Sequence, residues 1–217
     1  MQGSAQEETS TCHYTIAIQP IVNAQLHHVA DELLYRGDFS AGTAAVFDDV
    51  QATARACAVA IYEIGLDKLC GQRKLFINAS GEWLLNPDLD GLPKEQIVIE
   101  VLEDTAVSDA LLTALRQLKT QGYTLALDDF ELTDANRSLL ALADIIKFDI
   151  STGLPKALIQ RLYQDGYTLL AERVETYEEF EQCKALGFSL FQGYFYQRPQ
   201  VQTTKTQRHS TSRANQI

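Results

Sequence analysis

Two adjacent carboxylates carry the clearest chemistry in this sequence. Thr124-Leu-Ala-Leu is a short apolar run of the kind that a buried strand has, and Asp128 and Asp129 follow it directly. Two anions this close repel each other and raise each other's pKa unless a positive charge lies between them. Taken alone, the pair is more typical of an ordinary turn or helix cap, because Asp is common where strands end. The rest of the chain decides between these two interpretations.

Similar polar groups follow the other predicted strands. In a barrel, side chains at the carboxyl ends of the strands converge on one mouth, where active sites form. Caps and loop-facing groups explain any one such residue, but they do not explain a polar residue on every strand from the second to the eighth. These residues are, strand by strand, Glu32, Asn78, Glu100 with Glu103, Asp128 with Asp129, Lys147, Glu172 with Glu175, and Gln192.

Such a ring of carboxylates requires cations. Seven carboxylates are balanced only by Lys147 and Arg36, so the sequence predicts bound divalent metal. Oxygen ligands without His or Cys favour Mg²⁺ or Mn²⁺, with Ca²⁺ as a competitor, and argue against zinc. Two ions about 3.5–4 Å apart, bridged by one carboxylate, are the usual arrangement for phosphodiester hydrolysis. Asp128 and Asp129 are suitably placed for that arrangement.

The apolar pattern favours an α/β barrel as the architecture that positions these groups. Near-continuous apolar strands that alternate with helices indicate a parallel sheet covered on both faces, and eight such strands close into a (β/α)₈ barrel. A flavodoxin-like open sheet is the alternative, but the strands are too many and no glycine-rich phosphate loop is present. The predicted strands cover residues 14–22, 29–36, 75–78, 97–103, 124–130, 145–149, 168–175 and 188–194, and the main helices cover 44–69, 108–120, 155–164 and 177–186.

Length, charge and termini set the limits of the prediction. A chain of 217 residues suits one barrel, which we place at residues 12–200, between a disordered lead over 1–11 and a disordered tail or linker over 201–217. The 18 Lys and Arg against 29 Asp and Glu argue against a DNA-binding or anionic-membrane surface. No apolar run approaches a membrane span, no signal-peptide core is present, and the four cysteines form no CxxC pair. We therefore expect a cytoplasmic protein.

The order of these motifs resembles the EAL domain, a barrel that hydrolyses the second messenger cyclic di-GMP to linear pGpG. The resemblance covers residues 14–199, and its finer details are similar to the subgroup in which an EAL domain precedes an HDOD domain. In the naming motif the middle Ala is replaced by Leu. The motifs are Glu32-Leu-Leu-Tyr-Arg36, Phe76-Ile-Asn78, Ile99-Glu100-Val-Leu-Glu103, Leu127-Asp128-Asp129-Phe130, Ile146-Lys147-Phe-Asp149, Ala171-Glu172-Arg-Val-Glu175-Thr176 and Phe191-Gln192-Gly193-Tyr194.

The resemblance implies a role for each of these positions. It implies that two Mg²⁺ or Mn²⁺ ions are bound and that Ca²⁺ inhibits. The implied catalytic residues are Lys147, Asp128 and Glu175, of which Lys147 orients the attacking water. The implied partners are cyclic di-GMP, a second copy of the chain, and either a C-terminal HDOD domain or another protein. The implied ligands of one ion are Glu32, Asn78, Glu100 and Asp128, and those of the other are Asp128, Asp129 and Glu172. The residues implied to bind substrate are Gln19, Arg36 and Gln192. Glu103 is implied to support the loop after the aspartates.

Two departures from the family pattern leave a second function open. Glu131 stands where the family has glycine, which can adopt conformations forbidden to other residues, and the loop after it is about two residues shorter. Arg173 also stands where glycine is usual, and we expect it to point away from the mouth. The sequence therefore predicts a cyclic di-GMP phosphodiesterase, and the alternative is a catalytically silent domain that senses cyclic di-GMP or binds a protein partner. Enolase-like proton chemistry would use similar residues, but the order of the motifs does not support it.

Overall fold

The computed structural model describes residues 11–36, 61–62, 64–87, 89, 92–134 and 136–207. Most of the helix predicted over 44–69 and nearly all of the lead predicted over 1–11 lie outside these residues. In the described part, Cys70 and Cys183 are free and buried. No helix of the described part has the length and apolar character needed to cross a membrane.

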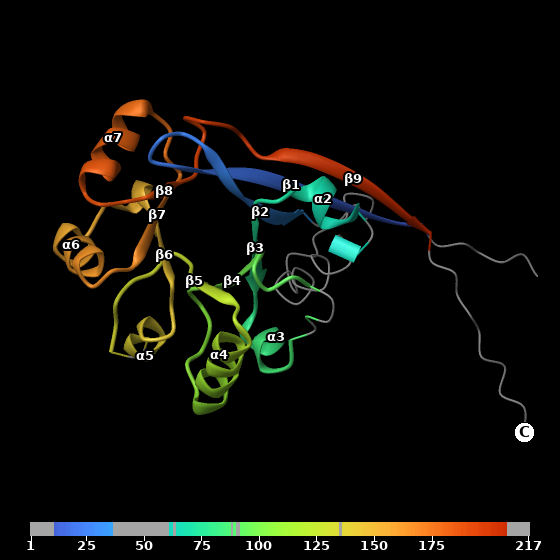
Figure 1. Ribbon diagram of the computed structural model, residues 1–217, viewed down its shortest axis with the longest axis horizontal. Coiled ribbons are helices and arrows are strands. Elements are labelled where there is room, and N and C mark those ends of the chain that lie inside the picture. Colours follow the sequence, from blue (N-terminus) through green and yellow to red (C-terminus); the bar gives the residue numbers. More distant parts are fainter. Residues whose placement is uncertain are drawn as a thin grey trace, which may run out of the picture.

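Eight strands close into a barrel, which confirms the predicted fold class (Figure 1). Around the barrel, β2 to β8 follow one another in sequence order, and β1 closes the ring by pairing with both β8 and β2. The strands are β1 (Thr11–Asn23), β2 (His28–Arg36), β3 (Lys74–Ala79), β4 (Ile97–Val101), β5 (Thr124–Leu127), β6 (Ile145–Asp149), β7 (Thr168–Glu172) and β8 (Leu190–Phe191).

The first strand departs from the all-parallel arrangement that the alternating pattern predicts. β2 to β8 run parallel to one another, but β1 is antiparallel to both of its barrel neighbours. The cause is the short link to β2, because consecutive strands joined by a tight turn pair antiparallel. The Asn23 side chain closes this turn by accepting hydrogen bonds from the backbone N–H groups of Gln25 and His27.

A ninth strand, β9 (Gln200–Gln207), occupies part of the segment predicted as a disordered tail. It runs antiparallel to β1, from Ile18 opposite Gln200 to Thr11 opposite Gln207. The alternation of Gln, Thr and Val in this segment supplies β-branched residues that suit a strand, and the extended β1 offers it an unpaired edge. The polar composition of this segment therefore led to a predicted tail that begins too early. Residues 208–217 lie outside the described part.

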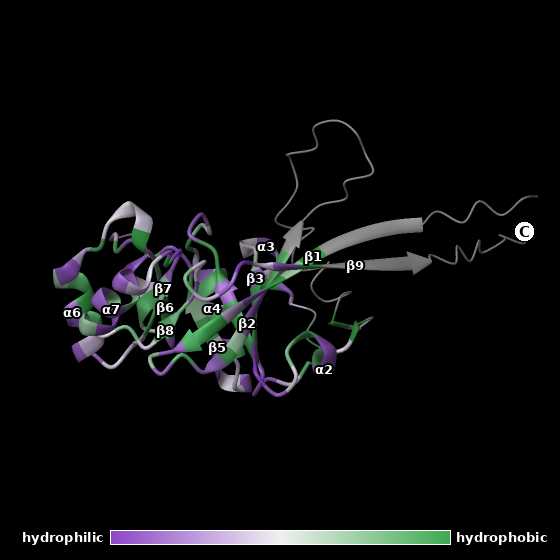
Figure 2. Ribbon diagram, turned by 90° about the horizontal axis from the view of Figure 1, so that it is seen from above, coloured by the Kyte–Doolittle hydropathy of each residue, from purple (hydrophilic) through white to green (hydrophobic). Residues whose placement is uncertain are grey.

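Helices pack on the outside of the barrel (Figure 1). Side-chain caps fix the starts of some of them: Ser108 accepts from the backbone N–H of Leu111, and Thr176 forms a capping box with Glu179. Figure 2 shows the green hydrophobic strands in the interior and purple segments on the helices around them. The helices are α2 (Leu66–Leu69), α3 (Gly81–Leu85), α4 (Asp109–Gln121), α5 (Arg137–Leu140), α6 (Lys156–Gln164) and α7 (Tyr177–Ala185), with a 3₁₀ turn η1 at Ile150–Thr152.

The barrel interior holds a small apolar layer that is separate from the larger core between strands and helices. Successive residues of a strand point to opposite faces, so the residue two positions further along lies on the same inner face. Each residue of the apolar layer on β2 to β7 is followed, two positions later, by one of the predicted site residues. The apolar layer consists of Ile21, Ala30, Phe76, Val98, Ala126, Ile145 and Leu170, with Leu190 packed against it.

Candidate metal centre

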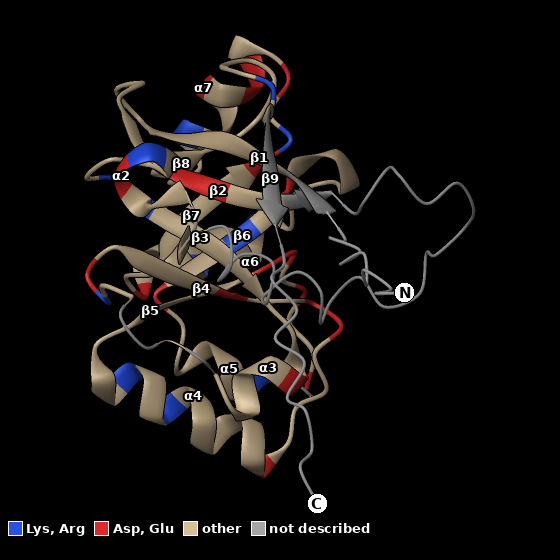
Figure 3. Cartoon of the chain, turned by 90° about the vertical axis from the view of Figure 1, so that its right-hand side faces the viewer, with Lys and Arg blue, Asp and Glu red and all other residues tan. Residues whose placement is uncertain are grey.

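The site residues form the layer directly above this apolar layer, at the carboxyl ends of the strands. The register of the sheet sets Glu100 beside Asn78 and Gln19 beside Glu32. Figure 3 shows charged residues on the barrel strands, including acidic residues on β2 and a basic residue on β6. The strand periodicity thus brings together the groups that the sequence places at separate strand ends.

Lys147 lies at the centre of this layer. Its Nζ is 2.9 Å from Glu100 Oε1, 2.8 Å from Asp128 Oδ1, 2.9 Å from Glu172 Oε1 and 3.8 Å from Glu32 Oε1. Only 1% of the Lys147 side chain is exposed, so the ammonium group is desolvated and depends on these anions. One cation faces four carboxylates, so the layer carries an excess of negative charge whenever all four are ionised.

A second set of contacts fixes Glu32. Gln192 Nε2 donates to Glu32 Oε2 at 2.7 Å, and Asn78 Nδ2 donates to Glu32 Oε1 at 3.3 Å. Because the Asn78 amide nitrogen faces Glu32, the Asn78 Oδ1 is left buried without a hydrogen-bond partner. Glu100 Oε1 meets the Lys147 ammonium group, but the buried Glu100 Oε2 has no hydrogen-bond partner. Buried oxygens are rarely left unsatisfied, and amide and carboxylate oxygens are the ligands that hard divalent cations take. These residues therefore fit one metal ion.

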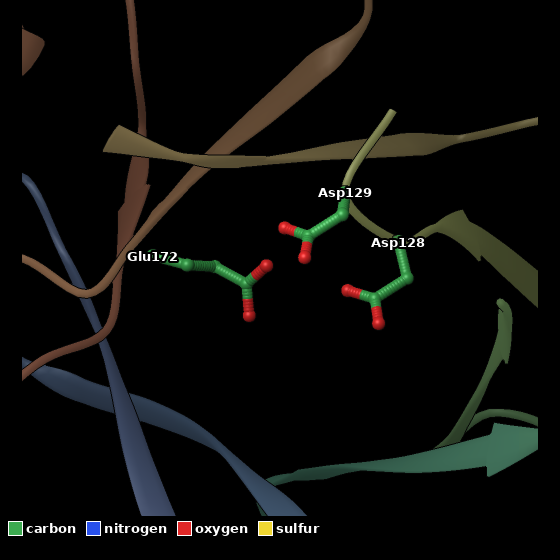
Figure 4. A group of neighbouring side chains, drawn as sticks. All are labelled: Asp128, Asp129 and Glu172. Atoms are coloured by element: carbon green, nitrogen blue, oxygen red, sulfur yellow. The ribbon is translucent and has the colours of Figure 1, made fainter. Parts of the chain in front are cut away.

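Three further carboxylates fit a second ion. Asp128, Asp129 and Glu172 each offer an oxygen within 4.8 Å of the others, and Figure 4 shows the three groups turned toward one another. Two neighbouring residues can face the same point because the chain leaves β5 here: Asp129 has a φ of 38°, in the left-handed region. Backbone bonds hold this turn, since Asp128 N–H donates to the Val101 carbonyl and Phe130 N–H to the Lys147 carbonyl.

The pKa values of three carboxylates at the site are raised. Burial, together with the charges of Asp128 and Glu32, raises the pKa of Glu172 to about 8, although Lys147 opposes the shift. Burial also raises the pKa of Glu100 well above its usual range, and the pKa of Asp129 is raised by burial and by the adjacent Asp128. The arrangement is thus one that bound cations would stabilise.

A cavity of about 410 Å³ opens above the layer, and we call it the site cavity. Gln19, Glu175 and Gln192 line it together with several of the charged residues. Glu103 and Glu131 are exposed and line a different cavity of about 1040 Å³, which reaches the first only at Asp128 and Asp129. The side chain of Arg36 lies outside the described part, and the predicted roles of all these residues stay predictions.

The prediction for Arg173 is wrong in its direction. Arg173 lines the site cavity, and its Nη1 lies 3.1 Å from Asp149 Oδ2. Strict alternation along β7 would turn it outward, but the strand ends at Glu172 and Arg173 has a φ of 54°. Sequence reasoning also left Asp149 without a role, although this residue belongs to the same short motif as Lys147.

Comparison with known proteins agrees with the geometry. Cyclic di-GMP phosphodiesterase CdgJ of Vibrio cholerae is 38% identical over 200 residues, which are 90% of this chain and 46% of that protein. The uncharacterized protein YuxH of Bacillus subtilis is 35% identical over 194 residues, which are 86% of this chain and 47% of that protein. The chain thus spans about half the length of these relatives.

Solved structures show the same barrel. The manganese and cyclic di-GMP complex of Klebsiella pneumoniae BlrP1 superimposes with a TM-score of 0.67 at 28% identity. The match covers 90% of this chain and 59% of the BlrP1 chain. The calcium and cyclic di-GMP complex of the same protein has a TM-score of 0.67 at 27% identity, over 94% of this chain and 63% of that one. The EAL domain family model matches residues 3–199. The chain belongs to the EAL domain family.

Proposed function

We propose that this domain hydrolyses cyclic di-GMP to linear pGpG with the help of divalent metal ions. The observation that carries the proposal is the pair of buried oxygens, Asn78 Oδ1 and Glu100 Oε2, that have no hydrogen-bond partner, beside the carboxylate cluster of Asp128, Asp129 and Glu172. A domain that only contacted a protein partner would have no use for such costly groups in its interior. The phosphodiesterase CdgJ and the cyclic di-GMP complexes of BlrP1 support the choice of substrate.

The donor set favours Mg²⁺ or Mn²⁺. Glu32, Asn78, Glu100 and Asp128 would hold one ion, and Asp128, Asp129 and Glu172 would hold the other. When bound, the ions would polarise the phosphoryl oxygens and lower the pKa of a bound water. Calcium and manganese occur in the BlrP1 complexes, and we expect Ca²⁺ to permit binding but not turnover in this chain.

The protein's own groups would place the water and the phosphodiester. Lys147 stands among the carboxylates with its ammonium group within 2.9 Å of three of them, so it can orient the attacking water. Gln192 and Asn78 keep Glu32 in a fixed orientation through their hydrogen bonds. Glu175 and Gln19 line the cavity where substrate would lie, and they would contact the water shell and the nucleotide.

The loop after Asp129 favours a second candidate function, a catalytically silent receptor of cyclic di-GMP. This loop is held by its own contacts, among them a hydrogen bond of 2.7 Å from Asn136 Nδ2 to the Glu131 carbonyl. Among the described contacts, no hydrogen bond or ion pair joins Glu103 to the loop, although the family resemblance assigns it that support. We favour the enzyme because the Glu131 side chain lines the other cavity and adds no charge to the lining of the site cavity.

Turnover decides between the two candidates. Purified protein is incubated with cyclic di-GMP and Mn²⁺ or Mg²⁺, and pGpG is followed by chromatography; we expect product. Tight binding in Ca²⁺ without product over hours would overturn the enzyme and favour the receptor, and no binding at all would leave a protein partner. Asp128→Asn should abolish turnover and leave the circular dichroism spectrum unchanged, because the change removes one shared charge from the site without altering its volume. Normal activity in this variant would contradict the bridging role of Asp128.

A further inference from the structure

Arg173 is a basic group that the proposed mechanism does not use. It follows Glu172, one of the three clustered carboxylates, and it lines the site cavity. Its φ of 54° is uncommon for a residue other than glycine, and such strained residues concentrate at functional sites. The position and the conformation both direct attention to what its guanidinium can bind.

The charge of the site cavity makes this guanidinium distinctive. Among the described lining residues, Lys147 and Arg173 are the basic ones, against five carboxylates. Lys147 is 1% exposed and is occupied by its four carboxylates, whereas 68% of the Arg173 side chain is exposed. Of the two, only Arg173 can meet a ligand that arrives from solvent without first leaving its partners.

Asp149 anchors the guanidinium from one side. Its Oδ1 accepts from Ser151 N–H at 2.8 Å and Ser151 Oγ–H at 2.6 Å, which turns Oδ2 toward Arg173 Nη1 at 3.1 Å. Asp149 is also the register partner of Glu172 between β6 and β7, so the anchor is built on the sheet itself. A guanidinium has five N–H donors, and this one contact leaves donors available for an anion.

We propose that Arg173, held by Asp149, binds a non-bridging phosphate oxygen of the cyclic dinucleotide in the site cavity. This inference rests on the proposed function, because it takes cyclic di-GMP as the ligand. A guanidinium suits a phosphate because its fork of N–H groups matches two oxygens, which a single ammonium group cannot do. The position next to Glu172 sets it beside the place where the metal-bound phosphodiester would lie. Arg173 thus acts as a substrate-binding residue that the usual glycine cannot replace.

The test measures the affinity of the full chain for cyclic di-GMP by calorimetry in Ca²⁺, where no turnover is expected. Arg173→Gln keeps a polar, unbranched side chain but shortens it and removes the charge and the guanidinium fork, and we expect the dissociation constant to rise about 10- to 100-fold. The dissociation constant of Arg173→Lys should lie between those of wild type and Arg173→Gln, because lysine keeps the charge but lacks the fork of N–H groups. The matched control is Arg161→Gln: Arg161 on α6 is 67% exposed and pairs with Asp165, and its loss should leave the affinity within about twofold.

Salt dependence separates phosphate binding from a merely structural pair. Wild-type affinity should fall more steeply with KCl than that of Arg173→Gln, while the thermal midpoints of the two proteins stay alike. If wild type binds and Arg173→Gln binds within twofold with the same salt dependence, the inference is overturned and the proposed function stands. If wild type neither binds nor hydrolyses cyclic di-GMP, the proposed function fails and this inference fails with it. Should Arg173→Gln not fold, Arg173→Lys at wild-type affinity and salt dependence would overturn the inference.

Discussion

Replacing Lys147 by Met removes the one cation at the centre of the site layer. Glu100, Asp128 and Glu172 each lie within 2.9 Å of its Nζ, and burial with its neighbours already raises the pKa of Glu100. Removing one partner of a buried ion pair costs about 3–5 kcal/mol, because the remaining charge has no compensation. In a domain of this size that cost lowers the melting temperature by about 6–20 °C. The loss should be smaller below about pH 8 than above it, because Glu172, whose pKa is about 8, then carries a proton instead of a charge.

The assay is thermal unfolding followed by circular dichroism, in EDTA and in MnCl₂. Mn²⁺ should recover most of the stability of Lys147→Met, because a divalent ion supplies the missing positive charge, yet turnover should stay abolished. Lys184→Met is the control: Lys184 pairs with Glu181 at 3.4 Å on the surface of α7, and its loss should cost less than about 1 kcal/mol. A Lys147→Met protein as stable as wild type in EDTA, or one that Mn²⁺ stabilises no more than wild type, would refute this account of the site.

Two further predictions concern pH and the backbone beside Gln192. The pKa of Glu172 is about 8, so Mn²⁺ affinity measured by calorimetry should rise up to about tenfold per pH unit below pH 8 and level off above it. In the folded metal-free chain Glu172 keeps its proton up to about pH 8, whereas in the unfolded chain it loses the proton above its usual pKa of 4.5. The free energy of unfolding in EDTA should therefore fall as the pH rises from 4.5 to 8. A Mn²⁺ affinity that does not change with pH would contradict the raised pKa on which both expectations rest. A Cβ at Gly193 would lie 1.9 Å from the Val174 carbonyl oxygen, so Gly193→Ala should cost about 3 kcal/mol in urea unfolding. Gly153 is the control, because its φ is also positive but no atom would lie within 4 Å of an added Cβ. Gly153→Ala should therefore cost only about 1 kcal/mol. Equal costs for the two substitutions would show that the contact with Val174 is not the cause.

The sequence was sufficient to predict the barrel and most of the ring of site groups because both follow from strand periodicity. A polar residue that ends an apolar strand shares its face with the residue two positions earlier, and parallel strands bring their ends to one mouth. The antiparallel β1 and the added β9 depend instead on a tight turn and on a free strand edge, which no periodicity records. Arg173 was misplaced for a related reason: alternation holds only inside the strand, and its left-handed backbone lies one residue beyond the end of β7.

The difference between positions inside a strand and positions beyond its end also matters for the loop after Asp129, which gave the strongest argument in the sequence against activity. Glycine at position 131 would matter if the loop had to adopt a special conformation there in order to bring the aspartates to the metal centre. In the structure the left-handed turn falls on Asp129, two residues earlier, and the Phe130 ring behind it is 5% exposed. Backbone hydrogen bonds to Val101 and Lys147 fix this turn from the barrel side. The aspartates therefore owe their positions to the end of β5, and Glu131 bears on the loop beyond the metal centre rather than on the centre itself.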